Sequence, residues 1–173
     1  EDAYARYNSG TSPKPERLTK AFRLSYPLSP VHRYTCITGE CSSRRVAGEA
    51  ESWNVSVTEY LAGVYLYVLQ SIFRDLPERT RKRVKKILRV QVPVNLRRLY
   101  PTKSMRNFTL FVTPGIDLRL GWYELDDILQ RVHRYMQNDT DRRHIDQQLA
   151  RNQNPEKNVF LRLLPLFAKN VLL

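Results

Sequence analysis

The sequence is poor in cysteine and in long apolar runs, and each shortage excludes a class of protein. Cys36 and Cys41 are the only cysteines among the 173 residues, and no histidine stands with them in zinc-ligand spacing. One close pair excludes a disulfide framework, so we expect no metal and buried or idle thiols in a cytoplasmic protein. No apolar run reaches the roughly 18 residues that a membrane-spanning helix needs, so we also expect no membrane span.

The familiar catalytic and phosphate-binding motifs are missing as well. The six glycines form neither GxGxxG nor GxxxxGK[ST], and no GxSxG elbow occurs. None of the three histidines, His32, His133 and His144, has an aspartate four residues on or belongs to an HExxH motif. We therefore expect His133 and His144 to lie at the surface, and we expect no self-contained catalytic site.

Positive charge is the property present in excess. The formal net charge is +12, and Arg79–Lys86 is an almost uninterrupted basic run. Such a balance favours a phosphate-bearing partner such as nucleic acid, a cofactor nucleotide or an anionic membrane surface, or it reflects only a solvated basic face. The run has no interleaved aromatic residues and matches no nucleic-acid-binding signature, which argues against nucleic acid as a partner.

The helical signal is strongest after Asn54. Ser56-Val57-Thr58-Glu59 fits a capping box, in which the serine hydroxyl and the glutamate side chain each bind the other residue's amide. Apolar residues then recur at helical spacing as far as Arg74, which predicts a helix over Val57–Arg74 that is buried on most sides. The residues expected to pack it against the rest of the domain are Leu61, Tyr65, Val68 and Ile72.

Alternating patterns predict the remainder of an α/β domain. Apolar and polar residues alternate over Leu88–Val94 and again over Phe108–Val112, so we expect both in one mixed sheet packed with helices. A further helix begins at about Tyr123. Residues 1–20 are polar and rich in turn formers, which indicates a linker or extended segment ahead of a domain spanning residues 21–173.

Three stretches resemble the second lobe of the chloramphenicol-acetyltransferase-like superfamily, which includes alcohol acetyltransferases and peptide-synthetase condensation domains. Asn54–Ala62 is similar to a helix start of that family. Val92–Arg98, followed by Asn107-Phe108, is similar to its "vpVdlR" strand and the element after it, and Leu161–Asn170 resembles a late helix of the alcohol acetyltransferases. The stretches occur in the family's order, but its HHxxxDG motif, which belongs to the first lobe, does not occur here.

The resemblance implies one lobe of a two-lobed acyltransferase fold, with acetyl-CoA or another acyl-CoA as donor and a small-molecule acyl acceptor. The motif histidine of the missing N-terminal lobe would be the general base, so this chain by itself is expected to be inactive. Its candidate substrate-channel residues are Asn107, Thr58 and Arg97. Each also has a structural interpretation: Asn107 would shape the loop, Thr58 would serve the first turn of the helix, and Arg97 would form an ion pair. The face meant for the first lobe would be covered by that lobe or by another copy of the chain. The alternative function is a non-catalytic binding or scaffold domain for an anionic partner.

Overall fold

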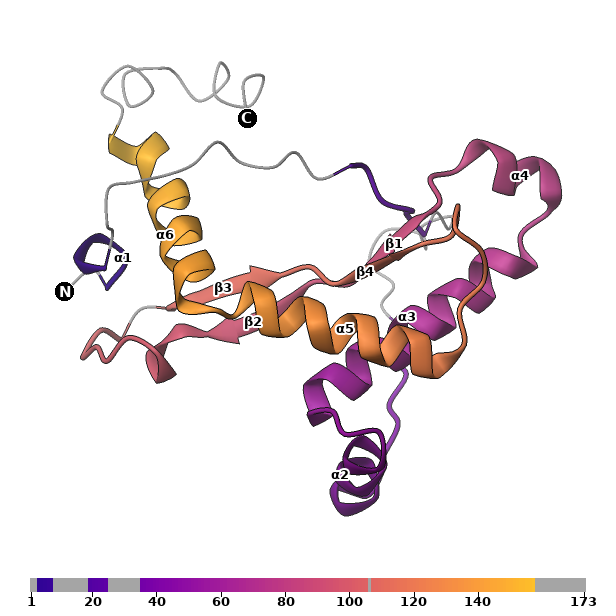
Figure 1. Cartoon of the computed structure of the whole chain (residues 1–173), viewed down its shortest axis with the longest axis horizontal. Helices are drawn as coiled ribbons and strands as arrows, with labels where there is room; N and C mark the ends of the chain where they lie inside the picture. Colours follow the sequence, from indigo (N-terminus) through magenta and orange to yellow (C-terminus); the bar gives the residue numbers. More distant parts are fainter. Residues whose placement is uncertain (1–2, 8–18, 25–34, 106, 158–173) are drawn as a thin grey trace. The chain divides into compact units, whose positions relative to one another are not determined.

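The computed structural model describes residues 3–7, 19–24, 35–105 and 107–157 (Figure 1). The chain forms two compact units. The first consists of residues 1–18, 93–112 and 137–173, and the second of residues 19–92 and 113–136. The helices are α1 (Ala3–Arg6), α2 (Ser43–Ser52), α3 (Val57–Asp75), α4 (Glu78–Arg83), the 3-10 turn η1 (Leu96–Arg98), α5 (Leu125–Asp139) and α6 (Arg142–Lys157). The strands are β1 (Ile87–Arg89), β2 (Val92–Asn95), β3 (Thr109–Val112) and β4 (Gly115–Asp117).

The mixture of helices and strands agrees with the predicted α/β class, but the expected single mixed sheet is not seen among the described residues. Instead, β1 pairs with β4 in an antiparallel ladder, and β2 pairs with β3 in a second two-stranded sheet. The predicted strand Leu88–Val94 is thus divided between the two sheets. Pro114 lies between β3 and β4, whereas Pro93 lies within β2, and a proline has no amide hydrogen to give to a ladder.

The second unit is organised around α3, whose start follows the predicted capping box. The Ser56 amide donates to Glu59 Oε2 at 2.7 Å, and the Glu59 amide donates to Ser56 Oγ at 3.3 Å. The helix runs to Asp75 and stops before Pro77, one residue beyond the predicted end. Its boundaries therefore follow from local hydrogen bonding and from the proline, as the sequence indicates.

The predicted packing face of α3 is wrong for three of its four residues, and the fourth, Ile72, is partly buried. Leu61, Tyr65 and Val68 are about half exposed, at 53%, 50% and 48%. The buried side chains of the helix are those of Glu59, Ala62, Leu66, Leu69, Gln70 and Phe73, together with Gly63. The helix is apolar around most of its circumference, so spacing alone could not select a face. The small residues decide it, because Leu129 of α5 approaches Gly63 so closely that an added Cβ would lie 2.5 Å from Leu129 Cδ2.

The first unit has its own core, built mainly from segments far apart in the sequence. It contains Ala3, Leu96, Tyr100, Phe108, Leu110, Ile145 and Leu149, with Tyr7 packed against it. The Tyr7 hydroxyl donates to the carbonyl of Pro101 at 2.6 Å. Part of the polar segment 1–20 is therefore helical and contributes Ala3 to a core, a contact that its composition does not indicate.

Two further predictions concern the surface. Cys36 and Cys41 are both free and exposed, so neither is a buried thiol. Among the helices that the structure describes, none combines the length and the apolar character needed to cross a membrane.

Candidate functional site

Two of the three predicted channel residues lie at one end of the β2–β3 pair. The Leu96 amide donates to the Phe108 carbonyl at 3.1 Å, and this bond brings the neighbouring Arg97 and Asn107 to the same end of the ladder. Asn107 is exposed, and its Oδ1 accepts a hydrogen bond from Thr109 Oγ1 at 2.6 Å. An exposed amide at a strand start can still donate through its nitrogen, which is the role that an oxyanion contact requires.

The described partners of Arg97 lie in its own loop. Its Nη2 donates to the carbonyl of Ser104 at 2.9 Å, and its amide donates to Asn95 Oδ1 at 3.1 Å. Both bonds hold the polar connection between β2 and β3 in shape. The described contacts of Arg97 therefore support its structural role in the loop.

The third predicted residue, Thr58, belongs to the second unit. It is exposed in the first turn of α3, directly before Glu59. Thr58 is thus accessible to a ligand. The structure describes the two units separately, so Thr58 on one side and Asn107 and Arg97 on the other form two local groups.

The most notable polar group of the second unit is a pair that the sequence does not predict. His133 of α5 places its Nδ1 3.2 Å from Oε1 of Glu59, at the start of α3. The carboxylate is almost fully buried, with 10% of its side chain exposed, while the imidazole is 28% exposed. The predicted surface position of His133 is therefore only partly correct, because one edge of the ring faces a buried carboxylate.

The environment of Glu59 keeps this carboxyl group ionised. Burial on its own would raise the pKa of Glu59, but hydrogen bonds with the backbone and side chain of Ser56 and with His133 lower that pKa below its ordinary value. A carboxylate beside Nδ1 restrains the orientation of the imidazole, and this contact ties α5 to the start of α3.

His144 does not share this arrangement. His144 is half exposed, with its Nδ1 3.8 Å from Asp139 Oδ1, as expected for a surface histidine near a carboxylate. His32 and the stretch Leu161–Asn170 lie outside the described residues. A search for a histidine with an aspartate four residues on misses His133, because its carboxylate comes from another helix.

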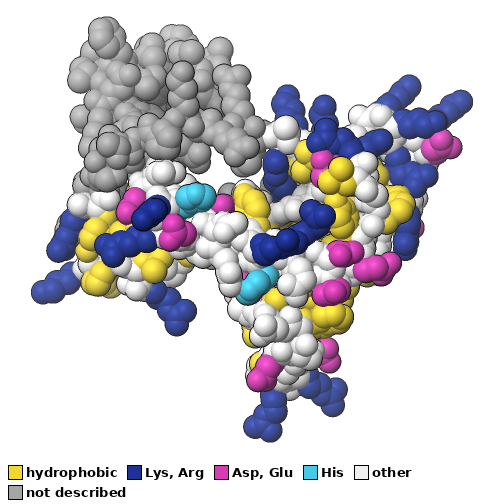
Figure 2. Space-filling view, in the orientation of Figure 1, with side chains coloured by type: hydrophobic (Ala, Val, Ile, Leu, Met, Phe, Trp, Pro, Cys, Tyr) yellow, Lys and Arg dark blue, Asp and Glu magenta, His cyan; other side chains and the backbone are white. Residues whose placement is uncertain are grey.

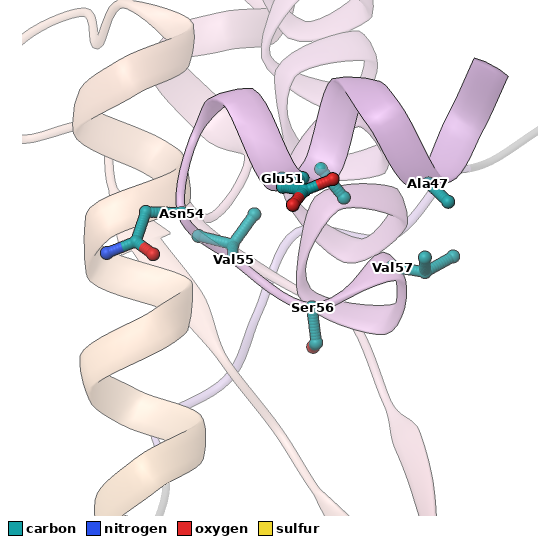
Figure 3. Close-up of a pocket in the computed structure, with 7 residues that line it drawn as sticks. Ala47, Glu51, Asn54, Val55, Ser56 and Val57 are labelled. Atoms are coloured by element: carbon teal, nitrogen blue, oxygen red, sulfur yellow. The ribbon is translucent and has the colours of Figure 1, made fainter. Parts of the chain in front are cut away.

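A cavity of about 340 Å³ lies where α2 meets α3. Figure 3 shows Ala47 and Glu51 on α2, and Asn54, Val55, Ser56 and Val57 along the connection and the start of α3. Asn54 turns the chain here with a left-handed φ of 56°, a conformation that asparagine tolerates better than most residues. The lining contains no histidine, and its Ser56 hydroxyl caps α3, so this cavity offers space without an activated nucleophile.

Metal ligands and relatives give no further indication of chemistry. In the part of the chain that the structure describes, no group of three or more His, Cys, Asp or Glu is arranged to hold a metal ion. No protein-family model, curated protein or solved structure matches the chain.

Proposed function

We propose that this chain is the second lobe of an acyl-CoA-dependent acyltransferase of the chloramphenicol-acetyltransferase-like type. In this proposal a first lobe of the same protein supplies the HHxxxD histidine as general base. The donor is acetyl-CoA or another acyl-CoA, and the acceptor is a small molecule. Asn107 and Thr58 orient the substrates, and Arg97 keeps the loop beside Asn107 in shape. The chain alone then has no turnover, because its own polar groups position substrates without supplying the catalytic base.

The observation that carries the proposal is an unpartnered apolar row on α3, the helix that begins with the family-like stretch. Val57, Leu61, Tyr65 and Val68 follow one another at helical spacing, and each is between 41% and 53% exposed. We call this row the α3 stripe. Contiguous apolar surface of this kind marks an interaction site in soluble proteins. A missing lobe that covers the stripe explains why a helix so apolar leaves one side exposed.

The test compares acetyl transfer by the 173-residue chain with transfer by the same chain joined to a first lobe that carries an HHxxxD motif. Thiol release from acetyl-CoA in the presence of alcohols or amines reports turnover. We expect none from the chain alone and turnover from the joined form. Turnover by the chain alone that disappears on changing His133 or His144 would refute the proposal.

Substitutions in the α3 stripe test the proposed contact directly. Leu61→Asp and Tyr65→Asp place a charge in the apolar row, so each should weaken association of the two lobes by tenfold or more, since burying an unpaired charge costs several kcal/mol. Gln130→Asp on the exposed side of α5 is the matched control and should leave association unchanged. Equal effects of all three substitutions would show that the stripe is not the contact.

The second candidate is a non-catalytic binding or scaffold domain for an anionic partner. The basic helix α4, in which Arg79, Arg81, Lys82 and Arg83 accompany one glutamate, favours it. Absence of acetyl transfer in the joined form, with salt-sensitive anion binding retained, would support this second function. For either function we propose a cytoplasmic setting, which the two exposed, unpaired thiols support.

A further inference from the structure

A second cavity, of about 230 Å³, lies beside α4 in the second unit, and we call it the α4 cavity. Figure 2 shows Lys and Arg side chains gathered over α4, at the upper right. The α4 cavity combines these cations with an aromatic wall. Its lining residues are Phe73, Glu78, Arg81, Lys82, Lys86, Leu118 and Trp122. Neither the candidate channel residues nor Glu59 and His133 belong to it.

The apolar wall of the α4 cavity is held in place by the fold. Phe73 is buried, and its ring lies 6.3 Å from that of Trp122, which is 53% exposed. The residue after Trp122 is fixed by a buried glutamine: Gln70 Nε2 donates to the Tyr123 carbonyl at 2.8 Å, and the Tyr123 amide donates to Gln70 Oε1 at 3.0 Å. An exposed indole on a fixed backbone is a ready surface for a flat ring.

The other wall of the α4 cavity is cationic and is formed by Arg81, Lys82 and Lys86. Lys82 is paired with Glu78 at 2.7 Å, so this lysine is compensated within the lining. Arg81 Nη1 donates to the Arg74 carbonyl at 3.3 Å, which positions the guanidinium and leaves other N–H groups of its five to bind a ligand. Lys86 is exposed, and its carbonyl accepts the Leu118 amide at 2.8 Å, which ties the two edges of the cavity together.

We propose that the α4 cavity binds a nucleotide, with phosphoryl groups on Arg81 and Lys86 and the base against Trp122. Arginine and lysine are the side chains that recognise phosphate. An exposed indole can stack on any of the nucleic-acid bases. The cavity is smaller than the roughly 300–1,000 Å³ of sites that enclose a drug-sized molecule. It therefore encloses only part of the ligand, which is a mononucleotide or the nucleotide end of a larger cofactor.

The first experiment measures binding of ADP to the 173-residue chain. The chain has two tryptophans, so Trp53→Phe leaves Trp122 as the only indole, and ADP should quench its fluorescence. Trp122→Leu should weaken ADP binding, measured by calorimetry, about tenfold, the effect of losing one stacked base. The same substitution should not change binding of pyrophosphate, which has no base.

The second experiment tests the cations. Arg81→Gln and Lys86→Gln should each weaken ADP binding about tenfold, as loss of a charge-assisted hydrogen bond does. Lys85→Gln removes the same charge from the same basic run at a position outside the lining, and should change the affinity less than twofold. Far-UV circular dichroism of each variant confirms that the helices are retained.

Several outcomes would overturn the inference. If Lys85→Gln weakens ADP binding as much as Lys86→Gln does, then ADP is held by general electrostatic attraction and not by a defined site. Pyrophosphate bound as tightly as ADP, with no effect of Trp122→Leu, would identify a polyanion surface. The same conclusion follows if RNA or vesicles with anionic lipid bind and ADP does not.

The inference does not rest on the proposed function, although coenzyme A has a nucleotide end that would suit the α4 cavity. Binding is measured without turnover. A chain that binds ADP through Trp122 and Lys86, but supports no acetyl transfer when joined to a first lobe, would keep the inference and refute the function. A joined enzyme that is active but does not bind ADP would support the function and refute the inference.

Discussion

The close approach of α3 and α5 predicts opposite effects of one substitution at two helical glycines. Gly63 of α3 is buried, and a Cβ there would meet Leu129 Cδ2 at 2.5 Å and Cγ at 3.3 Å. Leu129 is itself fully buried in a cluster with Ala50 and Val55, so it has little room to move aside. Gly48 of α2 is exposed, and a Cβ there would meet nothing within 4 Å.

The magnitudes follow from two terms. Alanine is about 0.8–1.0 kcal/mol more favourable than glycine inside a helix, and both substitutions gain this term. Overpacking a filled core costs about 1–3 kcal/mol, and only Gly63→Ala incurs it. We expect Gly48→Ala to raise the free energy of unfolding by nearly 1 kcal/mol and Gly63→Ala to lower it by about 1 kcal/mol. The propensity term cancels in the difference between the variants, which isolates the packing cost.

Urea denaturation followed by circular dichroism at 222 nm measures this difference. The slope of free energy against urea should stay unchanged, so that midpoint shifts report stability alone. If Gly63→Ala is as stable as Gly48→Ala, then α3 and α5 do not meet through Gly63 and Leu129, and the packing face assigned to α3 is incorrect.

The remaining predictions concern two buried polar groups of α3. The lowered pKa of Glu59 stabilises the fold above the ordinary value of 4.5, and this stabilisation is lost as the pH falls through the lowered pKa. Glu59→Gln should therefore lower the free energy of unfolding at pH 7. The difference in stability between this variant and the unchanged chain should shrink below pH 4.5. A difference that does not vary with pH would show that the Glu59 carboxylate does not stabilise the fold. Gln70→Leu removes both hydrogen bonds to the Tyr123 backbone and leaves buried polar groups unpaired. It should therefore lower the free energy of unfolding, measured by urea denaturation, by about 2 kcal/mol or more. The control Gln130→Leu, at an exposed site, should change that free energy by less than about 0.5 kcal/mol.

Local hydrogen bonding and residue periodicity were enough to predict the start of α3 and several other elements. The Ser56–Glu59 capping box formed as predicted, because its hydrogen bonds join residues three apart and need no tertiary partner. The cap of α2 is equally local, because the Ser42 side chain accepts from the Arg45 amide three residues on. Alternation over Phe108–Val112 likewise located a strand, since period-two patterning is a property of one strand and its two faces.

Only the tertiary structure decided which residues meet across elements. The α3 pattern left several apolar faces equivalent, and Gly63 selected one of them because the absence of a side chain lets Leu129 approach. The Glu59–His133 pair and the Gln70–Tyr123 bonds join segments distant in sequence, so no local spacing predicts them. The division of the strands into two ladders depends on which strands pair with β1 and β2, and the pattern of one strand does not reveal its partner.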